Sequence, residues 1–289
     1  MTAHLPELVF RGRRAATGRA LVMAIVNRTP DSFYDKGATF ADDAARSAVD
    51  RAVAEGADIV DIGGVKAGEG REIGVEEEIE RVVPFVAEVR RRYSELVISV
   101  DTWRHEVGRA ACEAGADLLN DTWAGADPKL AEIAAEFGAG YVCSHTGGLP
   151  LRTDPYPERL SPDMFWPEYE DVVESVLTEV SERAERAVAL GVPRAGVLID
   201  PTFDFGKSTR HGLELLRHLD RLVGTGWPVL VALSNKDLIG ETLDVEVSDR
   251  LAGTLAATSL AAAAGAAVFR AHHVPETRKA VELVAAVGV

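Results

Sequence analysis

The sequence predicts an α/β fold, a (β/α)8 TIM barrel in a single domain, on three observations. Short, β-rich apolar runs alternate with Ala-rich amphipathic stretches along the chain, and eight such pairs follow one another. The 289 residues are long for one domain but usual for such a barrel. No linker divides the chain, so we expect one domain over residues 1–289.

The expected elements follow in strict order after a lead-in of residues 1–19, which carries an Arg cluster. Strands are expected near 21–27, 57–63, 96–101, 116–120, 139–145, 195–200, 228–234 and 266–272. Helices are expected near 41–55, 75–92, 104–114, 128–136, 168–190, 209–222, 248–264 and 275–286. Gly-Ala-Asp or a close relative precedes several strands, as expected where a helix ends at glycine and the chain turns into the next strand.

An open, doubly wound sheet is the alternative fold. Such a sheet usually carries a Gly-rich phosphate loop after its first strand, whereas this chain has Asn27-Arg28-Thr29-Pro30 there. The barrel is therefore favoured. Its longest irregular segment, the Pro-rich loop 146–167, follows the fifth strand and is either a lid over the active face or a surface insertion.

Composition and charge exclude several functions. The net charge of −15 argues against binding to nucleic acid or to an anionic membrane. No apolar run is long enough to span a bilayer and no apolar leader opens the chain, so we expect a cytoplasmic protein. Cys112 and Cys143 lie in apolar runs and fit buried thiols better than a disulfide or metal site.

Polar residues stand at the end of nearly every expected strand. In barrels of this kind the functional residues come from the carboxyl ends of the strands. One such residue alone is more often a helix cap or a turn former, but here the whole set converges on the barrel mouth. The set comprises Asn27, Asp61, Asp101, Asn120, Asp121, Ser144, His145, Asp200, Ser234, Asn235, Lys236, Arg270 and His272.

These side chains divide into two chemical groups. Carboxylate and amide groups on the third, fourth and sixth strands can accept hydrogen bonds from a flat heterocycle rich in N–H donors. Cations on the last two strands, where barrels commonly hold phosphate, can bind an anionic group: Lys236, Arg270 and His272. The alternative for Arg270 and Lys236 is a structural layer of ion pairs.

Several motifs, in this order, resemble the dihydropteroate synthase family from about residue 20 to 287. They are Asn27 to Phe33, Asp61-Ile62-Gly63-Gly64, Ser99-Val100-Asp101-Thr102, Asn120-Asp121, Asp200-Pro201 through Phe205-Gly206-Lys207, Ser234-Asn235-Lys236 and Arg270-Ala271-His272. The resemblance implies a pterin-binding barrel of folate biosynthesis. Its reaction condenses 6-hydroxymethyl-7,8-dihydropterin diphosphate with p-aminobenzoate, which makes the family enzymes transferases.

The resemblance also implies roles for individual residues. Asp101, Asn120, Asp200 and Lys236 match the family's pterin pocket. Asn27 matches the ligand of a Mg²⁺ ion that bridges the diphosphate.

Arg270 and His272 match the anion site, and with Lys236 they would act in catalysis by stabilising charge on the departing diphosphate. A homodimer through helices late in the chain is implied as well.

The chain departs from the family pattern in the loops that face p-aminobenzoate. In the second loop a Thr and an Arg are replaced by Ala67 and Gly68, and Lys66 is not in register to substitute for the Arg. At the seventh strand end an Arg and a Ser are replaced by Asn235 and Asp237. We expect the Asp237 carboxylate to repel that of p-aminobenzoate by roughly 1–4 kcal/mol at about 4 Å.

Two further departures add charge. Asp204 replaces a family Gly in the sixth loop, and Arg28 replaces an apolar residue after Asn27. We expect Arg28 to replace part of the missing guanidinium or to pair with Asp237.

Because the pterin side is kept and the p-aminobenzoate side is changed, three functions stay open. One is dihydropteroate synthase activity, with p-aminobenzoate or another acceptor. The second is a diverged pterin-binding paralogue with little or no such activity. The third and weakest is pterin-dependent methyl transfer, which requires a corrinoid partner.

Overall fold

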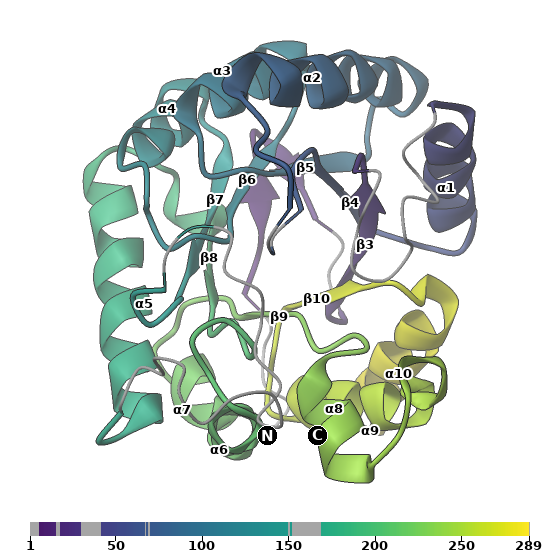
Figure 1. The fold of residues 1–289 in the computed structure, drawn as a ribbon, viewed down its shortest axis with the longest axis vertical. Helices are drawn as coiled ribbons and strands as arrows, with labels where there is room; N and C mark the ends of the chain where they lie inside the picture. The colour runs from purple at the N-terminus through teal and green to yellow at the C-terminus, as the bar shows by residue number, and fades with distance from the viewer. Residues whose placement is uncertain are drawn as a thin grey trace.

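Eight parallel strands form a closed barrel, as predicted (Figure 1). The computed structural model describes residues 6–15, 18–29, 42–66, 68, 70–149, 151 and 169–288. The strands are β3 (Leu21–Asn27), β4 (Ile59–Gly63), β5 (Val97–Asp101), β6 (Leu118–Asp121), β7 (Gly140–Ser144), β8 (Val197–Asp200), β9 (Leu230–Val231) and β10 (Val268–Ala271). Their order is β8-β7-β6-β5-β4-β3-β10-β9, and a parallel bridge between Ile199 and Val229 joins the two ends into a ring.

Helices surround this ring on its outer side (Figure 1). They are α1 (Asp42–Ala54), α2 (Val75–Arg92), α3 (His105–Ala114), α4 (Lys129–Phe137), α5 (Val172–Ala189), α6 (Thr209–Arg217), α7 (Leu219–Val223), α8 (Asp237–Leu243), α9 (Leu251–Ala263) and α10 (Val274–Val287), with short 3-10 turns at Arg194–Gly196 and Val247–Asp249. The helix expected over 209–222 is divided into α6 and α7, and α8 was not predicted. None of the helices in the described ranges is long and apolar enough to cross a membrane.

The lead-in contains a hairpin that closes the amino-terminal end of the barrel. Strands β1 (Val9–Phe10) and β2 (Arg13–Arg14) pair antiparallel, and their turn places Arg11 and Gly12 at positive φ. Phe10 is fully buried with the inward-facing apolar side chains of the barrel strands. A Cβ atom at Gly140 would lie 2.6 Å from the Phe10 ring, so the absence of a side chain there makes room for it.

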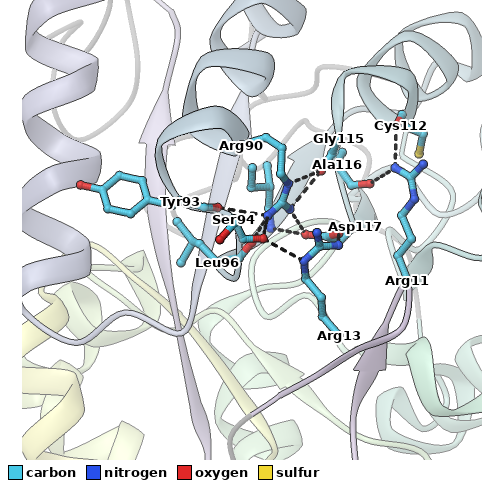
Figure 2. Close-up of polar contacts among 11 residues, drawn as sticks. Arg11, Arg13, Arg90, Tyr93, Ser94, Leu96, Cys112, Gly115, Ala116 and Asp117 are labelled. Carbon is cyan, nitrogen blue, oxygen red and sulfur yellow. Dashed lines mark hydrogen bonds and ion pairs between the residues drawn. The ribbon is translucent and has the colours of Figure 1, made fainter.

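Arginines fasten this hairpin to the barrel (Figure 2). Arg11 donates hydrogen bonds to the carbonyls of Cys112 and Ala116, at 2.6 and 3.0 Å. Arg13 and Arg90 both form ion pairs with the buried carboxylate of Asp117. The Arg cluster of the lead-in is therefore structural and lies at the end of the barrel opposite the polar strand ends.

Candidate functional site

Strand register brings the polar strand ends into one layer. Asn27 lies opposite Gly63, Gly63 opposite Asp101, and Asp101 opposite Asn120. A Cβ atom at Gly63 would lie 3.5 Å from the Cβ of Asp101 and 3.9 Å from Oδ1 of Asn27. Asn27 and Asp101 therefore approach the same point of the mouth.

Asp61 is the centre of the polar network, although no separate role was predicted for it. Its buried carboxylate accepts hydrogen bonds from Ser99 Oγ (2.6 Å), Asn120 Nδ2 (3.1 Å) and Arg270 Nε (2.6 Å). A charged residue within the apolar run of β4 was the available signal, because a buried charge needs partners.

Arg270 spans two strands and holds two carboxylates. Its Nη2 donates to Asp101 Oδ2 at 3.1 Å, in addition to its bond with Asp61. Burial alone would lower the pKa of Arg270, but the two carboxylates raise it, so the guanidinium is charged. In the described structure Arg270 is thus part of an ion-pair layer that reaches the mouth.

The expected heterocycle acceptors have raised pKa values. Burial raises the pKa of Asp101 to about 7, against the opposing effect of Arg270. Burial likewise raises the pKa of Asp200 to about 6, although Asp200 accepts the Thr202 N–H at 2.7 Å. Asn120 Oδ1 is buried and has no hydrogen-bond partner among the described residues. A ligand N–H at this position would satisfy it.

Lys236 lies at the start of α8, and its ammonium group forms an ion pair with Asp204 from the loop after β8. Its Nζ lies 5.8 Å from the centroid of the Phe205 ring. Phe205 packs edge-on against Trp123, with centroids 5.0 Å apart, and Trp103 lies 6.4 Å from Trp123. This aromatic cluster was not predicted from the sequence, although each ring follows a strand end within a few residues.

His272 is held beside Ser234. Its backbone N–H donates to Ser234 Oγ at 3.2 Å, and its Nδ1 lies 3.2 Å from the same oxygen. Burial, followed by the charges of Arg270 and Lys236, lowers the pKa of His272 to about 3. The expectation that His272 is a cation is therefore wrong for the protein without ligand: its imidazole is neutral.

The altered seventh strand end is packed into the protein. Asn235 is buried at φ 58°, a conformation that Asn tolerates, and its N–H donates to Thr254 Oγ1 at 3.1 Å. Arg250 donates to the Asn235 carbonyl and to Asp237 Oδ1, both at 2.8 Å. Asp237 is therefore paired with Arg250, and its repulsion of the p-aminobenzoate carboxylate stays a prediction.

Of the two alternatives expected for Arg28, the pairing with Asp237 is wrong, and the replacement of the missing guanidinium stays a prediction. The Arg28 guanidinium forms an ion pair with Asp42 at the start of α1 and lies 4.9 Å from the Phe85 ring centroid on α2. Packing between these helices directs the side chain to the outer side of the barrel. Ala67 and most of the loop 146–167 lie outside the described residues.

Within the described part of the chain, one group of His, Asp and Glu side chains has metal-ligand spacing: His105, Glu106 and Asp127. Asp127 Oδ2 accepts the His105 N–H at 3.0 Å, and its Oδ1 accepts the Lys129 N–H at 3.1 Å. Since Asp127 is engaged at the starts of α3 and α4, we assign this group a structural role.

Comparisons with known proteins agree with the geometry. The family profile described as "Pterin binding enzyme" matches residues 23–272. The chain is 61% identical over 276 residues to "Inactive dihydropteroate synthase 2" of Mycobacterium leprae, covering 96% of this chain and 93% of the relative. It is 34% identical to a "Dihydropteroate synthase" of Streptococcus pyogenes, covering 91% and 94%.

Solved structures give the same result. The structure of Mycobacterium tuberculosis Rv1207 has a TM-score of 0.74 and 50% identity, covering 96% of this chain and 97% of that one. Yersinia pestis dihydropteroate synthase in complex with a sulfonamide drug has a TM-score of 0.87 and 34% identity, covering 97% and 98%. The chain therefore belongs to the dihydropteroate synthase family of pterin-binding enzymes.

Proposed function

We propose that this protein binds a pterin in the barrel mouth and has little or no dihydropteroate synthase activity. The observation that carries the loss of activity is the ion pair between Lys236 and Asp204, because it engages a cation that would otherwise stabilise the departing diphosphate. Relatives at 61% identity are named inactive, which supports the same conclusion.

The pterin edge would lie against acceptors that the strands hold in place. Asp101 and Asp200 offer carboxylates to N–H donors, and Asn120 offers a buried amide oxygen that lacks a partner among the described residues. Leaving such groups unpaired in a dry pocket costs about 1–3 kcal/mol each, so a ligand that pairs with them is favoured.

The residues expected to face p-aminobenzoate lack the binding groups of the family pattern. Asn235 is buried against α9, and the Asp237 carboxylate is paired with Arg250. Neither presents the guanidinium or the hydroxyl that the family pattern has at these positions. A carboxylate substrate would have to approach Asp237 and compete with it for Arg250.

The residues fit a Mg²⁺ ion in part. Oδ1 of Asn27 and the Asp101 carboxylate are oxygen donors near one point of the mouth, and oxygen is the donor that Mg²⁺ prefers. When bound, the ion would neutralise charge on a diphosphate, while Arg270 and neutral His272 would orient that group by hydrogen bonds.

Calorimetry and product analysis test the proposal together. We expect heat from binding of 6-hydroxymethyl-7,8-dihydropterin or its diphosphate. We also expect no dihydropteroate by mass spectrometry after incubation with the diphosphate, p-aminobenzoate and Mg²⁺. Product at the rate of a canonical synthase assayed in parallel would refute the loss of activity, and absence of binding by both pterins would refute pterin binding.

A second candidate, transfer to a different acceptor, is favoured by the intact network of Arg270, Asp61 and Asp101. Incubation of the pterin diphosphate with a panel of arylamines tests it. Release of diphosphate that depends on one amine would support this function, and no release with any amine would exclude it for the panel.

We also propose a homodimer. Helix α9 has no charged residue, and its exposed face carries Ala252, Ala256, Leu260 and Ala263. Leu260 is 63% exposed and Leu283 on the adjacent α10 is 66% exposed. Sedimentation should show a dimer that Leu260→Glu converts to a monomer; a monomeric wild type would refute the assignment.

A cytoplasmic location is part of the proposal. Cys112 and Cys143 are both free and buried, which is compatible with a reducing compartment.

A further inference from the structure

The loop after β8 brings a carboxylate, Asp204, into the barrel mouth. Its partner is the ammonium group of Lys236, which lies after β9 and directly before α8. The side chains of Asp204 and Lys236 are 11% and 22% exposed, so the pair is largely shielded from solvent and salt screens it weakly.

Several contacts fix the position of this loop. The buried ammonium of Lys207 donates to the carbonyls of His145 (3.0 Å) and Phe205 (2.9 Å). Gly206 has φ 64°, and a Cβ atom there would collide with the Thr146 carbonyl. The Asp204 carboxylate is therefore held on a loop that is anchored to the neighbouring strand end.

The charge pattern of the mouth follows from this placement. Arg270 is paired with Asp61 and Asp101, and Lys236 is paired with Asp204. Among the described residues, Arg270 and Lys236, the two cations expected to bind an anion, are thus neutralised by protein carboxylates. An anionic ligand must displace a carboxylate or accept its repulsion, whereas an uncharged ligand meets no such charge repulsion.

The aromatic cluster favours the same ligand class. Trp103, Trp123 and Phe205 pack together above the strand ends, and the last of them precedes Gly206 in the Asp204 loop. The rings of Trp103, Trp123 and Phe205 are only 8%, 3% and 6% exposed, so they form a buried apolar layer, and desolvation beside it penalises a diphosphate more than an uncharged ring.

We infer that Asp204 determines ligand specificity and directs the site towards an uncharged pterin-type heterocycle that carries no phosphate. This inference rests on the proposed pterin binding. The Asp204 carboxylate acts by holding Lys236, which would otherwise be available to an anionic group.

Calorimetry with two ligands, each with and without Mg²⁺, tests the inference: 6-hydroxymethyl-7,8-dihydropterin and its diphosphate. The wild-type protein should bind the uncharged pterin at least as tightly as the diphosphate. Asp204→Asn should strengthen diphosphate binding by about tenfold or more, because a repulsive charge is removed and Lys236 is released. Binding of the uncharged pterin should change by less than about threefold.

Two further variants complete the design. Asp204→Gly restores the residue of the family pattern and should act in the same direction as Asp204→Asn. Asp220→Asn removes one carboxylate from the exposed surface of α7 and should change neither affinity.

The binding results distinguish the role of Asp204 from pterin binding itself. Tighter binding of the diphosphate by the wild type, unchanged in both Asp204 variants, would overturn the role of Asp204 and leave pterin binding intact. No binding of either pterin by any folded variant would overturn the proposed function itself.

Discussion

Replacing Arg270 by Met should destabilise the protein strongly, because the guanidinium holds two carboxylates in the barrel. Arg270 bonds to Asp61 at 2.6 Å and to Asp101 at 3.1 Å. Asp61 is fully buried, so its charge has no access to solvent after the substitution.

The magnitude follows from what Asp61 retains. Removing one partner of a buried ion pair costs about 3–5 kcal/mol. Asp61 still accepts hydrogen bonds from Ser99 and Asn120, so we expect the lower end, about 3 kcal/mol. For a protein of this size the melting temperature should fall by roughly 5 °C.

Denaturant unfolding of a double-mutant cycle is the assay. Asp61→Asn and the double variant complete the cycle, and the two substitutions should be coupled by about 1–3 kcal/mol. Arg109→Met is the matched control, because Arg109 forms a two-pronged pair with Glu136 at 2.7 and 2.6 Å on the surface. Its loss of stability should be far smaller.

Two results would refute this reasoning. One is an Arg270→Met variant that is no less stable than the Arg109→Met control. The other is additivity within about 0.5 kcal/mol of the Arg270→Met and Asp61→Asn effects, which would show that the two side chains do not interact in solution.

Three further predictions concern other parts of the molecule. Phe10→Ala should lower the free energy of unfolding by about 3–5 kcal/mol, measured by denaturant titration; a loss below about 1 kcal/mol would contradict its burial inside the barrel. Pterin affinity, measured by calorimetry, should rise between about pH 5 and pH 8. Asp200 and Asp101, with pKa values of about 6 and 7, lose their protons in this range and become stronger hydrogen-bond acceptors. A flat profile of affinity against pH would argue against their role. Sulfonamides, which imitate p-aminobenzoate, should give no heat of binding, and tight binding would show that Asp237 and Arg250 leave room for that carboxylate.

Much of the fold was predictable because its periodicity is local. All eight barrel strands were predicted within a few residues of their observed ends, since each is a short apolar run between helical patterns. The hairpin of β1 and β2 was missed because two-residue strands have no measurable period. Helix α8 was missed because its seven residues, Asp237–Leu243, span only two turns.

The sequence predicted which residues belong to the candidate site, but it did not predict which of their side chains contact one another. Asp61 depends on Ser99, Asn120 and Arg270, and Arg270 lies 209 residues further along the chain. The error about Arg28 has the same cause, because the direction of its side chain is set by the packing of α1 and α2.

The hairpin has a consequence for synthesis of the protein on the ribosome. Arg11 and the Ala116 carbonyl it binds are 105 residues apart, and Phe10 fits against Gly140, which is made later still. At about 5–20 residues per second, this apolar ring remains uncovered for many seconds after it is translated. Phe10 and Arg11 are therefore synthesised well before their partners, so chaperones have a long interval in which to bind this segment.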